Sequence, residues 1–238
     1  MYRKIRETLR TRINSGEYAA GTAIPSENSL AASFDVARLT VRRAVDALVS
    51  EGLLLRVQGK GVYVVKPGTR QSLDLIASFV DRRHVAGQDL ETRVLDRAIR
   101  AAGPYLARLM GIKAADEINV IRRLDLVDKE PVSLEETFVP VRRVPRLEGI
   151  DLSLFSLIEA FAFCGVRLST AHVWLDVVPL EAHDARLLDV GEGAPAVMRS
   201  MLVRDTRHRI VEYSRVYDLA SKASYSMTYH GEDNIDLA

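Results

Sequence analysis

Three arginines stand within six residues in the segment 36–43, VARLTVRR, and a turn pinched by two glycines, GKG, follows at 59–61. Both stretches offer cations, hydroxyls and backbone groups, but none of the carboxylates, histidines or nucleophiles that a catalytic site would need. Arginine binds a phosphate as a fork and guanine through two parallel hydrogen bonds. The chemistry predicted for these residues is therefore binding of a polyanion.

The distribution of charge along the chain supports this prediction. The 238 residues carry a formal net charge of +1. Residues 1–66 hold eleven lysines and arginines against six aspartates and glutamates, a net of +5, and the remainder holds twenty-two against twenty-six, a net of −4. A basic front and an acidic back favour a polyanionic partner for the front alone.

Three short helices and a hairpin are predicted to position the arginines. Apolar residues recur at helical spacing from Tyr2 to Ile13, and Gly16 follows where this helix would end. Ser26 is a suitable N-cap for a second helix, and a third helix ends before Gly52. The segments LLLRV and VYVV then flank the turn QGKG, which is a hairpin signal. Together these elements describe a winged helix-turn-helix.

In the third predicted helix the apolar residues share one side, so the arginines must face outward. The side predicted to be buried carries Val41, Ala44, Val45 and Leu48. The side predicted to be exposed carries Arg38, Leu39, Arg42 and Arg43. Thr40 can bond to a base or a phosphate, and Gly59 and Gly61 let Lys60 approach DNA closely. Such a helix alone is more often a solvated surface, but the spacing, the hairpin and the charge excess together favour DNA binding.

The sequence GTAIPSENSLAASFDVARLTVRRAVDALVSEGLLLRVQGKGVYVV resembles the N-terminal domain of the GntR family of bacterial transcription regulators, and the resemblance covers residues 2–65. It rests on the elements PSE, TVR, EGL and GKG, which fall at family spacing. It implies that Arg38, Thr40, Arg42 and Gly59 contact DNA. The full set of predicted DNA-binding residues is Ser26, Asn28, Arg38, Leu39, Thr40, Arg42, Arg43, Gly59 and Lys60.

Two positions depart from the family pattern. Asn28 stands where the family commonly has an arginine that reads a base, and asparagine pairs with adenine rather than guanine. Ala37 stands where the family often has a small hydroxyl residue, so one helix-capping or phosphate contact is expected to be missing. The usual operator pattern of the family is therefore not expected to apply unchanged.

A linker and an α+β region are predicted beyond the hairpin. The linker is expected at residues 67–72, within a stretch of proline, glycine and small polar residues. The alternating segments EINVIRRLDLV, VSLEETFV, LSTAHVWLDVV, AVMRSMLVR and RIVEYSRVY predict strands. SLFSLIEAFAF and PLEAHDARLL predict helices.

The first two of these strands bring polar residues together. A three-residue loop at 128–130 would place Arg123 opposite Glu135 and Asp125 opposite Ser133 on one face of the sheet. Two interpretations follow: an ion pair at the surface, contributing well under about 1 kcal/mol, or a polar cluster that lines a ligand cleft. Spacing alone favours the surface ion pair.

Residues 73–230 resemble the effector-binding domain called UTRA, found in the HutC branch of the GntR family. The features that carry the resemblance are SF at 78–79 with Gly87, the segment RRLDLVDKEPVSLEETFVP, the Ser-Leu helix start near 153–157, and VEYSRVY. It implies an antiparallel sheet with flanking helices, shared in outline with chorismate lyase, that binds small effectors and usually dimerises. The effector-binding residues that it implies are Ser78, Arg123, Asp125, Glu135, Ser153, Ser156, Glu212 and Tyr217.

Within this set, two features bear on the kind of effector. The serines, Ser78 with Ser153 or Ser156, are expected at helix starts near an anionic end of the ligand, because backbone N–H groups there favour phosphate or carboxylate. Asp125, however, stands where members that bind phosphosugars tend to carry a second arginine. An aspartate repels a phosphate and suits a hydroxyl-rich or cationic group, so a sugar phosphate is less expected.

Other classes of protein are disfavoured by composition. The single cysteine, Cys164, excludes an internal disulfide and favours a reducing compartment. The charged start MYRKIRETLR lacks the apolar core of a signal peptide, and no apolar run approaches the roughly 18 residues of a membrane span. We expect a cytoplasmic protein. The five histidines lack metal-ligand spacing, and no phosphate-binding glycine loop occurs, so neither a metal nor a cofactor is expected.

The expected fold class is α+β, with a winged helix-turn-helix at 1–66, a linker, and an antiparallel-sheet domain for effector binding and dimerisation at 73–238. The favoured function is a homodimeric repressor whose binding to a near-palindromic double-stranded operator is modulated by a small metabolite, such as a sugar, a sugar derivative or an organic acid. One alternative is an enzyme of chorismate-lyase-like fold with an accessory DNA-binding domain, although no acid/base or nucleophile constellation stands out. Another is an architectural DNA binder without a ligand.

Overall fold

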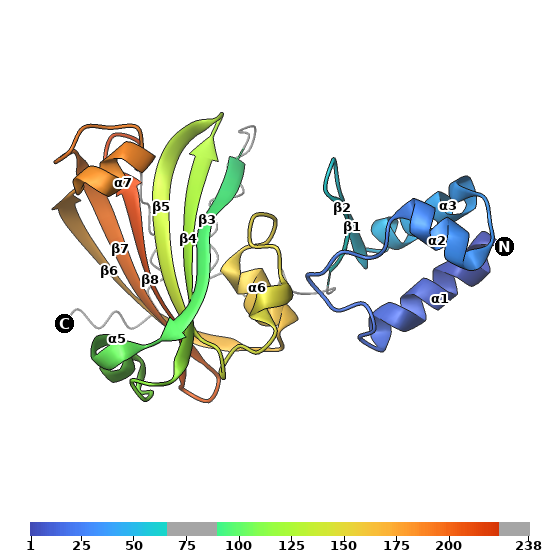
Figure 1. Ribbon diagram of the computed structural model, residues 1–238, viewed down its shortest axis with the longest axis horizontal. Helices are drawn as coiled ribbons and strands as arrows, with labels where there is room; N and C mark the ends of the chain where they lie inside the picture. The colour runs from blue at the N-terminus through green and yellow to red at the C-terminus, as the bar shows by residue number, and fades with distance from the viewer. Residues whose placement is uncertain (66–89, 224–238) are drawn as a thin grey trace, which may run out of the picture.

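The computed structural model describes residues 1–65 and 90–223 (Figure 1). The predicted linker at 67–72 and the predicted effector residue Ser78 lie outside these ranges. Helices and a two-stranded hairpin at the N-terminus are followed by a six-stranded sheet with short helices against it. The α+β class expected from the sequence is confirmed.

The N-terminal core is built from α1 (Tyr2–Asn14), α2 (Glu27–Phe34) and α3 (Arg38–Ser50). The side of α3 that the spacing predicts to be buried packs against Ile5 and Leu9 of α1. The residues of α3 with no exposed surface are Val41, Ala44, Val45 and Leu48. Burying one Val or Leu side chain contributes about 1.5–3 kcal/mol. This side of α3 is therefore fixed inward, and the opposite side is left to solvent.

The predicted hairpin is present and needs glycine at its tip. Strand β1 (Leu54–Val57) pairs with β2 (Gly61–Val64) in antiparallel register, and the turn between them is QGK. Gly59 has φ +74° and Gly61 has φ +125°. These values lie in the region that side chains rarely adopt, so the glycines make the tight tip possible.

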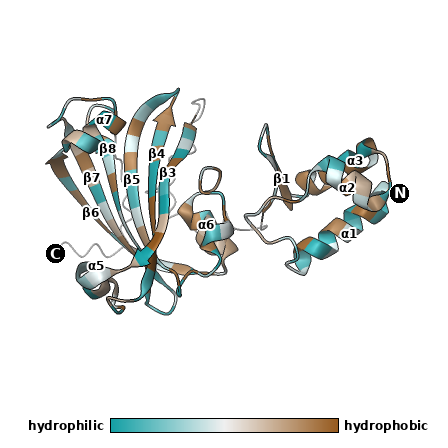
Figure 2. Ribbon diagram, in the orientation of Figure 1, coloured by the Kyte–Doolittle hydropathy of each residue, from teal (hydrophilic) through white to brown (hydrophobic). Residues whose placement is uncertain are grey.

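The second part of the chain is one antiparallel sheet in the strand order β3-β4-β5-β8-β7-β6. Its strands are β3 (Leu90–Ala101), β4 (Glu117–Val127), β5 (Glu130–Pro140), β6 (Leu168–Pro179), β7 (Pro195–Asp205) and β8 (Ile210–Leu219). Its helical segments are α5 (Gly103–Met110), η2 (Leu147–Gly149), α6 (Leu157–Phe163) and α7 (Ala182–Leu187). Hydrophilic and hydrophobic residues alternate along the strands, as expected of a sheet whose two faces meet different surroundings (Figure 2).

The predicted register of β4 and β5 is confirmed, but the predicted turn is wrong. Arg123 pairs with Glu135 and Asp125 with Ser133. The connection is a two-residue turn rather than a loop at 128–130, because the residues after β4 have positive φ, 51° at Asp128 and 71° at Lys129. Two residues of positive φ are typical of the tightest hairpin turn. A register shift after Asp125 keeps the pairing of Arg123 with Glu135.

The two faces of the sheet carry different helices (Figure 1). Helices α5 and α7 pack at opposite ends of one face, which we call the α7 face, with Phe138 near α5 and Leu134 near α7. Helix α6 packs on the other face, the α6 face, against Ile121 and Val139. Because neighbouring residues of a strand point to opposite faces, odd-numbered residues of β4 and β5 lie on the α6 face.

Some elements differ from the sequence prediction. The helix expected over 153–163 begins only at Leu157, because Ser156 is its N-cap. Strand β3 and helix α5 were not among the predicted elements. The other predicted strands and the helix now labelled α7 are present.

Candidate functional sites

The outward side of α3 presents the arginines that the sequence predicts. Arg38, Arg42 and Arg43 are exposed, and Leu39 beside them is 61% exposed. Thr40 is half-buried. These side chains occupy the first two turns of the helix, so they can reach a ligand together. An exposed leucine among cations also offers apolar contact, which suits the methyl group of thymine.

Arg38 is positioned by a network that the sequence analysis missed. Its Nε donates to Glu27 at 3.1 Å, and Arg56 of β1 donates to the other oxygen of the same carboxylate at 2.7 Å. Arg56 also donates to Asp46 of α3 at 2.7 Å. Burial acts to raise the pKa of Glu27, but hydrogen bonds from Arg56 and Arg38 outweigh it and hold this pKa below its usual range. The network therefore ties α2, α3 and the hairpin together.

The remaining predicted DNA-binding residues surround this side of α3. Ser26 caps α2 by accepting from the Ser29 amide at 3.1 Å, as predicted, and Asn28 is exposed in the first turn. Ala37 is the N-cap of α3 and provides no side-chain hydrogen bond, as its type implies. Gly59 and Lys60 lie exposed at the hairpin tip.

A second polar cluster lies on the α6 face of the sheet and is buried. Its members come from the inner strands β4, β5, β8 and β7. They are Arg123, Ser133, Glu135, Thr137, Arg199, Glu212, Ser214 and Asp218. Burying charges is costly unless they are paired and hydrogen-bonded. So many of them together indicate a site rather than an ordinary core.

Arg123 and Glu135 form the centre of this polar cluster. Their side chains are 9% and 10% exposed, so the interpretation as a surface ion pair is wrong. Arg123 donates through Nε to Glu135 at 3.1 Å and makes a shorter contact through Nη2, while Thr137 donates to the other Glu135 oxygen at 2.7 Å. Burial acts to raise the pKa of Glu135, but the charge of Arg123 and these hydrogen bonds hold it below its usual range.

Two further carboxylates differ in their surroundings. Asp125 accepts from Thr92 of β3 at 2.7 Å and from Ser133 at 3.3 Å. Glu212 is buried, and burial together with the charge of Glu135 raises its pKa to about 7. The polar cluster therefore holds one carboxylate that is firmly ionised, Glu135, and one that is poised to gain or lose a proton near neutral pH, Glu212.

The hairpin of the N-terminal part contacts the segment that precedes α6. Lys60 donates to the Ser153 hydroxyl at 2.9 Å, and that hydroxyl donates to Asp151 at 2.6 Å. Tyr63 is buried in the same apolar core as α6, where its ring meets Phe155 edge-on at 5.9 Å. The two parts of the chain thus share one core.

The shared core lies next to the polar cluster. Arg123 donates through Nη1 to the carbonyl of Leu152 at 3.4 Å, one residue before the serine that holds Lys60. Gly21 of the N-terminal part also packs against the second part of the chain, so tightly that a Cβ there would lie 2.8 Å from Phe163 and 3.1 Å from Ile150. A change at Arg123 can therefore reach the hairpin through a short run of contacts.

Comparison with known proteins identifies both parts of the chain. The profile described as "Bacterial regulatory proteins, gntR family" matches residues 1–64, and the UTRA domain matches residues 85–223. The chain belongs to the GntR family and carries a UTRA domain. Its N-terminal part therefore binds DNA, and its UTRA domain takes a small-molecule effector.

Relatives of this GntR regulator are named as repressors. It is 30% identical to the HTH-type transcriptional repressor NagR of Bacillus subtilis over 200 residues, 83% of this chain and 82% of that one. It is 26% identical to the probable fructoselysine utilization operon transcriptional repressor of Escherichia coli over 228 residues, 95% and 93% of the two chains. The chain is thus a transcription regulator, and the alternative of an enzyme is not favoured.

Solved structures show the same fold. The structure of PhnF from Mycobacterium smegmatis superposes with a TM-score of 0.59 at 21% identity, covering 96% of this regulator and all of that chain. No helix in the described parts of the chain is long and apolar enough to cross a membrane.

The structure brings together only part of the predicted effector site. Arg123, Glu135 and Glu212 share the α6 face with Asp125. Tyr217 does not join them, because it pairs with Leu134 and lies on the α7 face.

The two predicted serines within the described residues have structural partners. Ser156 forms a capping box with Glu159 at the start of α6, with its hydroxyl 2.9 Å from the Glu159 carboxylate. Ser153 lies before α6, not at a helix start, and its hydroxyl is shared by Lys60 and Asp151. Ser156 stands at a helix start, as predicted, but the hydroxyls of both serines already have partners within the protein.

Proposed function

We propose that the protein is a homodimeric repressor whose operator binding is relieved by an effector bound at the polar cluster of the α6 face. Residues 1–66 bind DNA in this proposal, and residues 73–238 bind the effector and dimerise. The observation that carries it is the contact of Arg123 with the segment that holds Lys60. In this arrangement Arg123 contacts the effector and Lys60 contacts DNA, and the segment with Leu152 and Ser153 connects them.

The proposed DNA contacts divide into base reading and positioning. Arg42, Arg43 and Asn28 are exposed where a recognition helix and its neighbour meet the major groove, so we assign them to base edges or nearby phosphates. Arg38 is fixed by Glu27, which suits a contact of defined geometry. Lys60 and the glycines at the hairpin tip suit the DNA backbone. A dimer would place two such surfaces on half-sites of a near-palindrome.

The proposed effector is a hydroxyl-rich sugar derivative that bears a cationic group and lacks a phosphate. The polar cluster with Asp125 holds more carboxylates than arginines, which opposes a phosphate and favours an ammonium group. Serine and threonine hydroxyls in the same cluster suit a polyol. The relative named for fructoselysine utilization is consistent with such a ligand.

The proposed dimer uses the edges of the sheet. Strands β3 and β6 lie at its two edges, and both expose large apolar side chains. These are Val94, Leu95, Ile99, Trp174, Leu175 and Val177. An exposed edge strand with apolar side chains is a template for pairing with another chain, and a second copy would supply that chain.

The proposed mechanism is competition for the hairpin. While Lys60 donates to Ser153 and Tyr63 is buried against Phe155, the hairpin is held to the UTRA domain and is not free to lie along the DNA backbone. An effector that engages Arg123 stabilises this docked state and withdraws the hairpin from DNA. A coupling of about 1–3 kcal/mol between effector and operator is expected.

The test begins with genomic fragments retained by the purified protein at physiological salt. An inverted repeat should be enriched, and binding to it should be relieved by fructoselysine or another amino-sugar derivative more readily than by phosphorylated sugars such as N-acetylglucosamine 6-phosphate. Retention that is indifferent to sequence would overturn the repressor proposal. Relief by the phosphorylated sugars alone would overturn the effector class only.

A further inference from the structure

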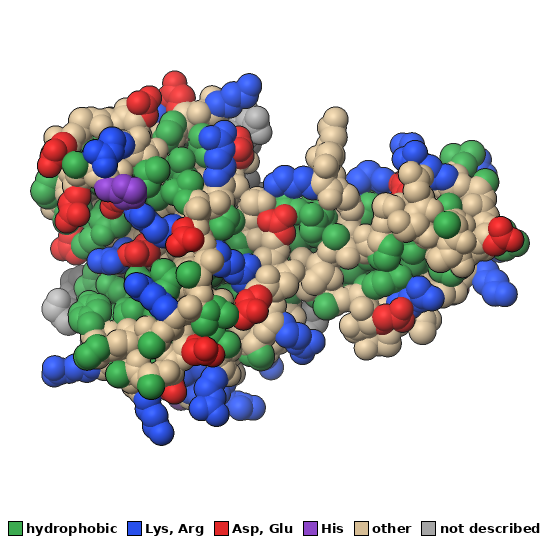
Figure 3. All heavy atoms as spheres, viewed as in Figure 1, with side chains coloured by type: hydrophobic (Ala, Val, Ile, Leu, Met, Phe, Trp, Pro, Cys, Tyr) green, Lys and Arg blue, Asp and Glu red, His purple; other side chains and the backbone are tan. Residues whose placement is uncertain are grey.

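A separate cavity of about 420 Å³ lies on the α7 face, on the other side of the sheet from the polar cluster. It lies where the face is left open between α5 and α7, and charged side chains of both signs gather over this face (Figure 3). The sheet separates the two sites, and strand β8 contributes residues to both. Glu212 points to the α6 face, whereas Arg215 and Tyr217 line the cavity.

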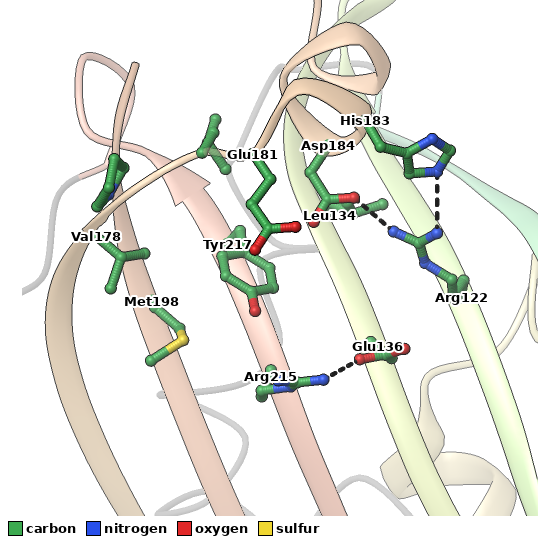
Figure 4. A pocket seen from close by; sticks show the side chains of 12 residues that line it. Arg122, Leu134, Glu136, Val178, Glu181, His183, Asp184, Met198, Arg215 and Tyr217 are labelled. Atoms are coloured by element: carbon green, nitrogen blue, oxygen red, sulfur yellow. Dashed lines mark hydrogen bonds and ion pairs between the residues drawn. The ribbon is translucent and has the colours of Figure 1, made fainter. Parts of the chain in front are cut away.

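Two ion pairs form part of the cavity wall. Arg122 donates to Asp184 of α7 at 2.7 Å and to His183 Nε2 at 3.2 Å. Arg215 donates to Glu136 across the sheet. Both guanidinium groups therefore already have a carboxylate partner at their ends (Figure 4), and the Nε of each, which has no hydrogen-bond partner among the described residues, is buried away from the open part of the cavity.

The polar side chains of the cavity that take no part in these ion pairs suit a cation. The side chains of Glu181 and Tyr217 both point into it (Figure 4), and neither side chain has a hydrogen bond to another described residue. The lining holds three carboxylates against two guanidinium groups. Burial raises the pKa of Tyr217; Arg215 opposes this rise, and the charges of Asp184, Glu136 and Glu181 add to it. The cavity is thus negative where its unpaired groups lie.

We propose that this cavity binds a small organic ammonium compound. The ammonium group lies between the Glu181 carboxylate and the Tyr217 hydroxyl, and an apolar stem lies along Leu134, Val178 and Met198. A carboxylate and a hydroxyl can accept hydrogen bonds from an ammonium group, which has three donors. The apolar wall can contact a stem of a few carbons. This site stands independently of the function proposed for the polar cluster.

The test follows the methyl resonance of Met198 in full-length protein labelled with 13C at the methionine methyl groups. Met201 is buried on the α6 face and is the internal control. The probes are n-butylammonium, n-butanol and butyrate, which share a stem and differ in charge. We expect butylammonium to shift the Met198 resonance at about millimolar concentration, with no saturable shift from butanol or butyrate. Met198→Leu identifies the resonance.

Glu181→Gln tests the charge directly while keeping the shape of the side chain. It should weaken butylammonium binding by about tenfold, which corresponds to about 1.4 kcal/mol. Glu192→Gln, an exposed glutamate outside the cavity, is the matched control and should bind as wild type. Equal shifts from butanol and butylammonium would overturn the proposal. So would a Met198 resonance that none of the probes moves, the result expected if a second copy covers this face.

Discussion

Glu212→Gln should change how the stability of the protein depends on pH. In the folded protein, burial and the neighbouring Glu135 raise the pKa of Glu212 from 4.5 to about 7. The folded state therefore retains a proton that the unfolded chain releases. Between pH 4.5 and pH 7 the unfolded state binds fewer protons than the folded state, so the free energy of unfolding falls as the pH rises.

The size of this effect follows from the pKa. Each unit of pKa corresponds to about 1.36 kcal/mol, so a rise from 4.5 to about 7 lowers the free energy of unfolding by about 3 kcal/mol across this range. The loss is complete above pH 7, where both states are ionised. Glutamine cannot ionise, so the variant does not lose this part of the free energy of unfolding as the pH rises. Glu135 does not compete in this range, because its pKa lies below the usual value.

Urea unfolding of both proteins at intervals from pH 4.5 to pH 8 measures the difference. The stability of Glu212→Gln relative to wild type should rise with pH by about 3 kcal/mol and then level off. Glu192→Gln removes an exposed carboxylate and should follow the wild type throughout. Parallel curves for wild type and Glu212→Gln, or a difference that shrinks as pH rises, would refute the argument that Glu212 is buried beside an ionised Glu135.

Three substitutions test the proposed DNA contact, the docked hairpin and the buried ion pair. Arg42→Ala should weaken operator binding by about 1–3 kcal/mol in fluorescence anisotropy, whereas the exposed Arg142→Ala should not. Gly21→Ala should clash with Phe163 and undock the hairpin, so that operator binding persists when effector is added; Gly16→Ala, with a similar φ but open space around it, should respond normally. Arg123→Met leaves Glu135 buried without its partner and should lower the free energy of unfolding by about 3–5 kcal/mol, visible in urea unfolding. Unchanged operator affinity of Arg42→Ala would contradict the DNA contact, and a normal effector response of Gly21→Ala would contradict the docked hairpin. An unchanged urea transition of Arg123→Met would contradict the buried ion pair.

The features predicted from the sequence are those that depend on periodicity. The inward side of α3 follows from the spacing of Val41 to Leu48, and the pairing of Arg123 with Glu135 follows from the parity of two facing strands. Strand β3 was not predicted, because its charged sequence LETRVLDRAIRA lacks the apolar alternation of a buried strand and becomes a strand through pairing with β4. The contact between Lys60 and Ser153 could not be predicted either, because the two residues are 93 positions apart and no sequence pattern links them.

The position of Tyr217 follows from strand geometry and not from the family resemblance. Resemblance assigned it to the same site as Glu212, yet the two residues are five positions apart on one strand, an odd number. Residues at odd separation on a regular strand point to opposite faces, and the structure places Tyr217 in the cavity of the α7 face. Parity alone would have corrected this prediction.

The shared core constrains how the two domains can communicate. Because Tyr63 is buried with Phe155, the hairpin cannot leave the UTRA domain without exposing an aromatic side chain and breaking the bond from Lys60 to Ser153. In the proposed mechanism, an effector contact at Arg123 stabilises the docked state, because Arg123 also donates to the carbonyl of Leu152 beside Ser153. DNA supplies a competing partner for the same lysine, since a phosphate is a stronger acceptor than a serine hydroxyl. In the proposed mechanism the hairpin is therefore the element whose equilibrium both ligands bias, which is the physical requirement for linkage between them.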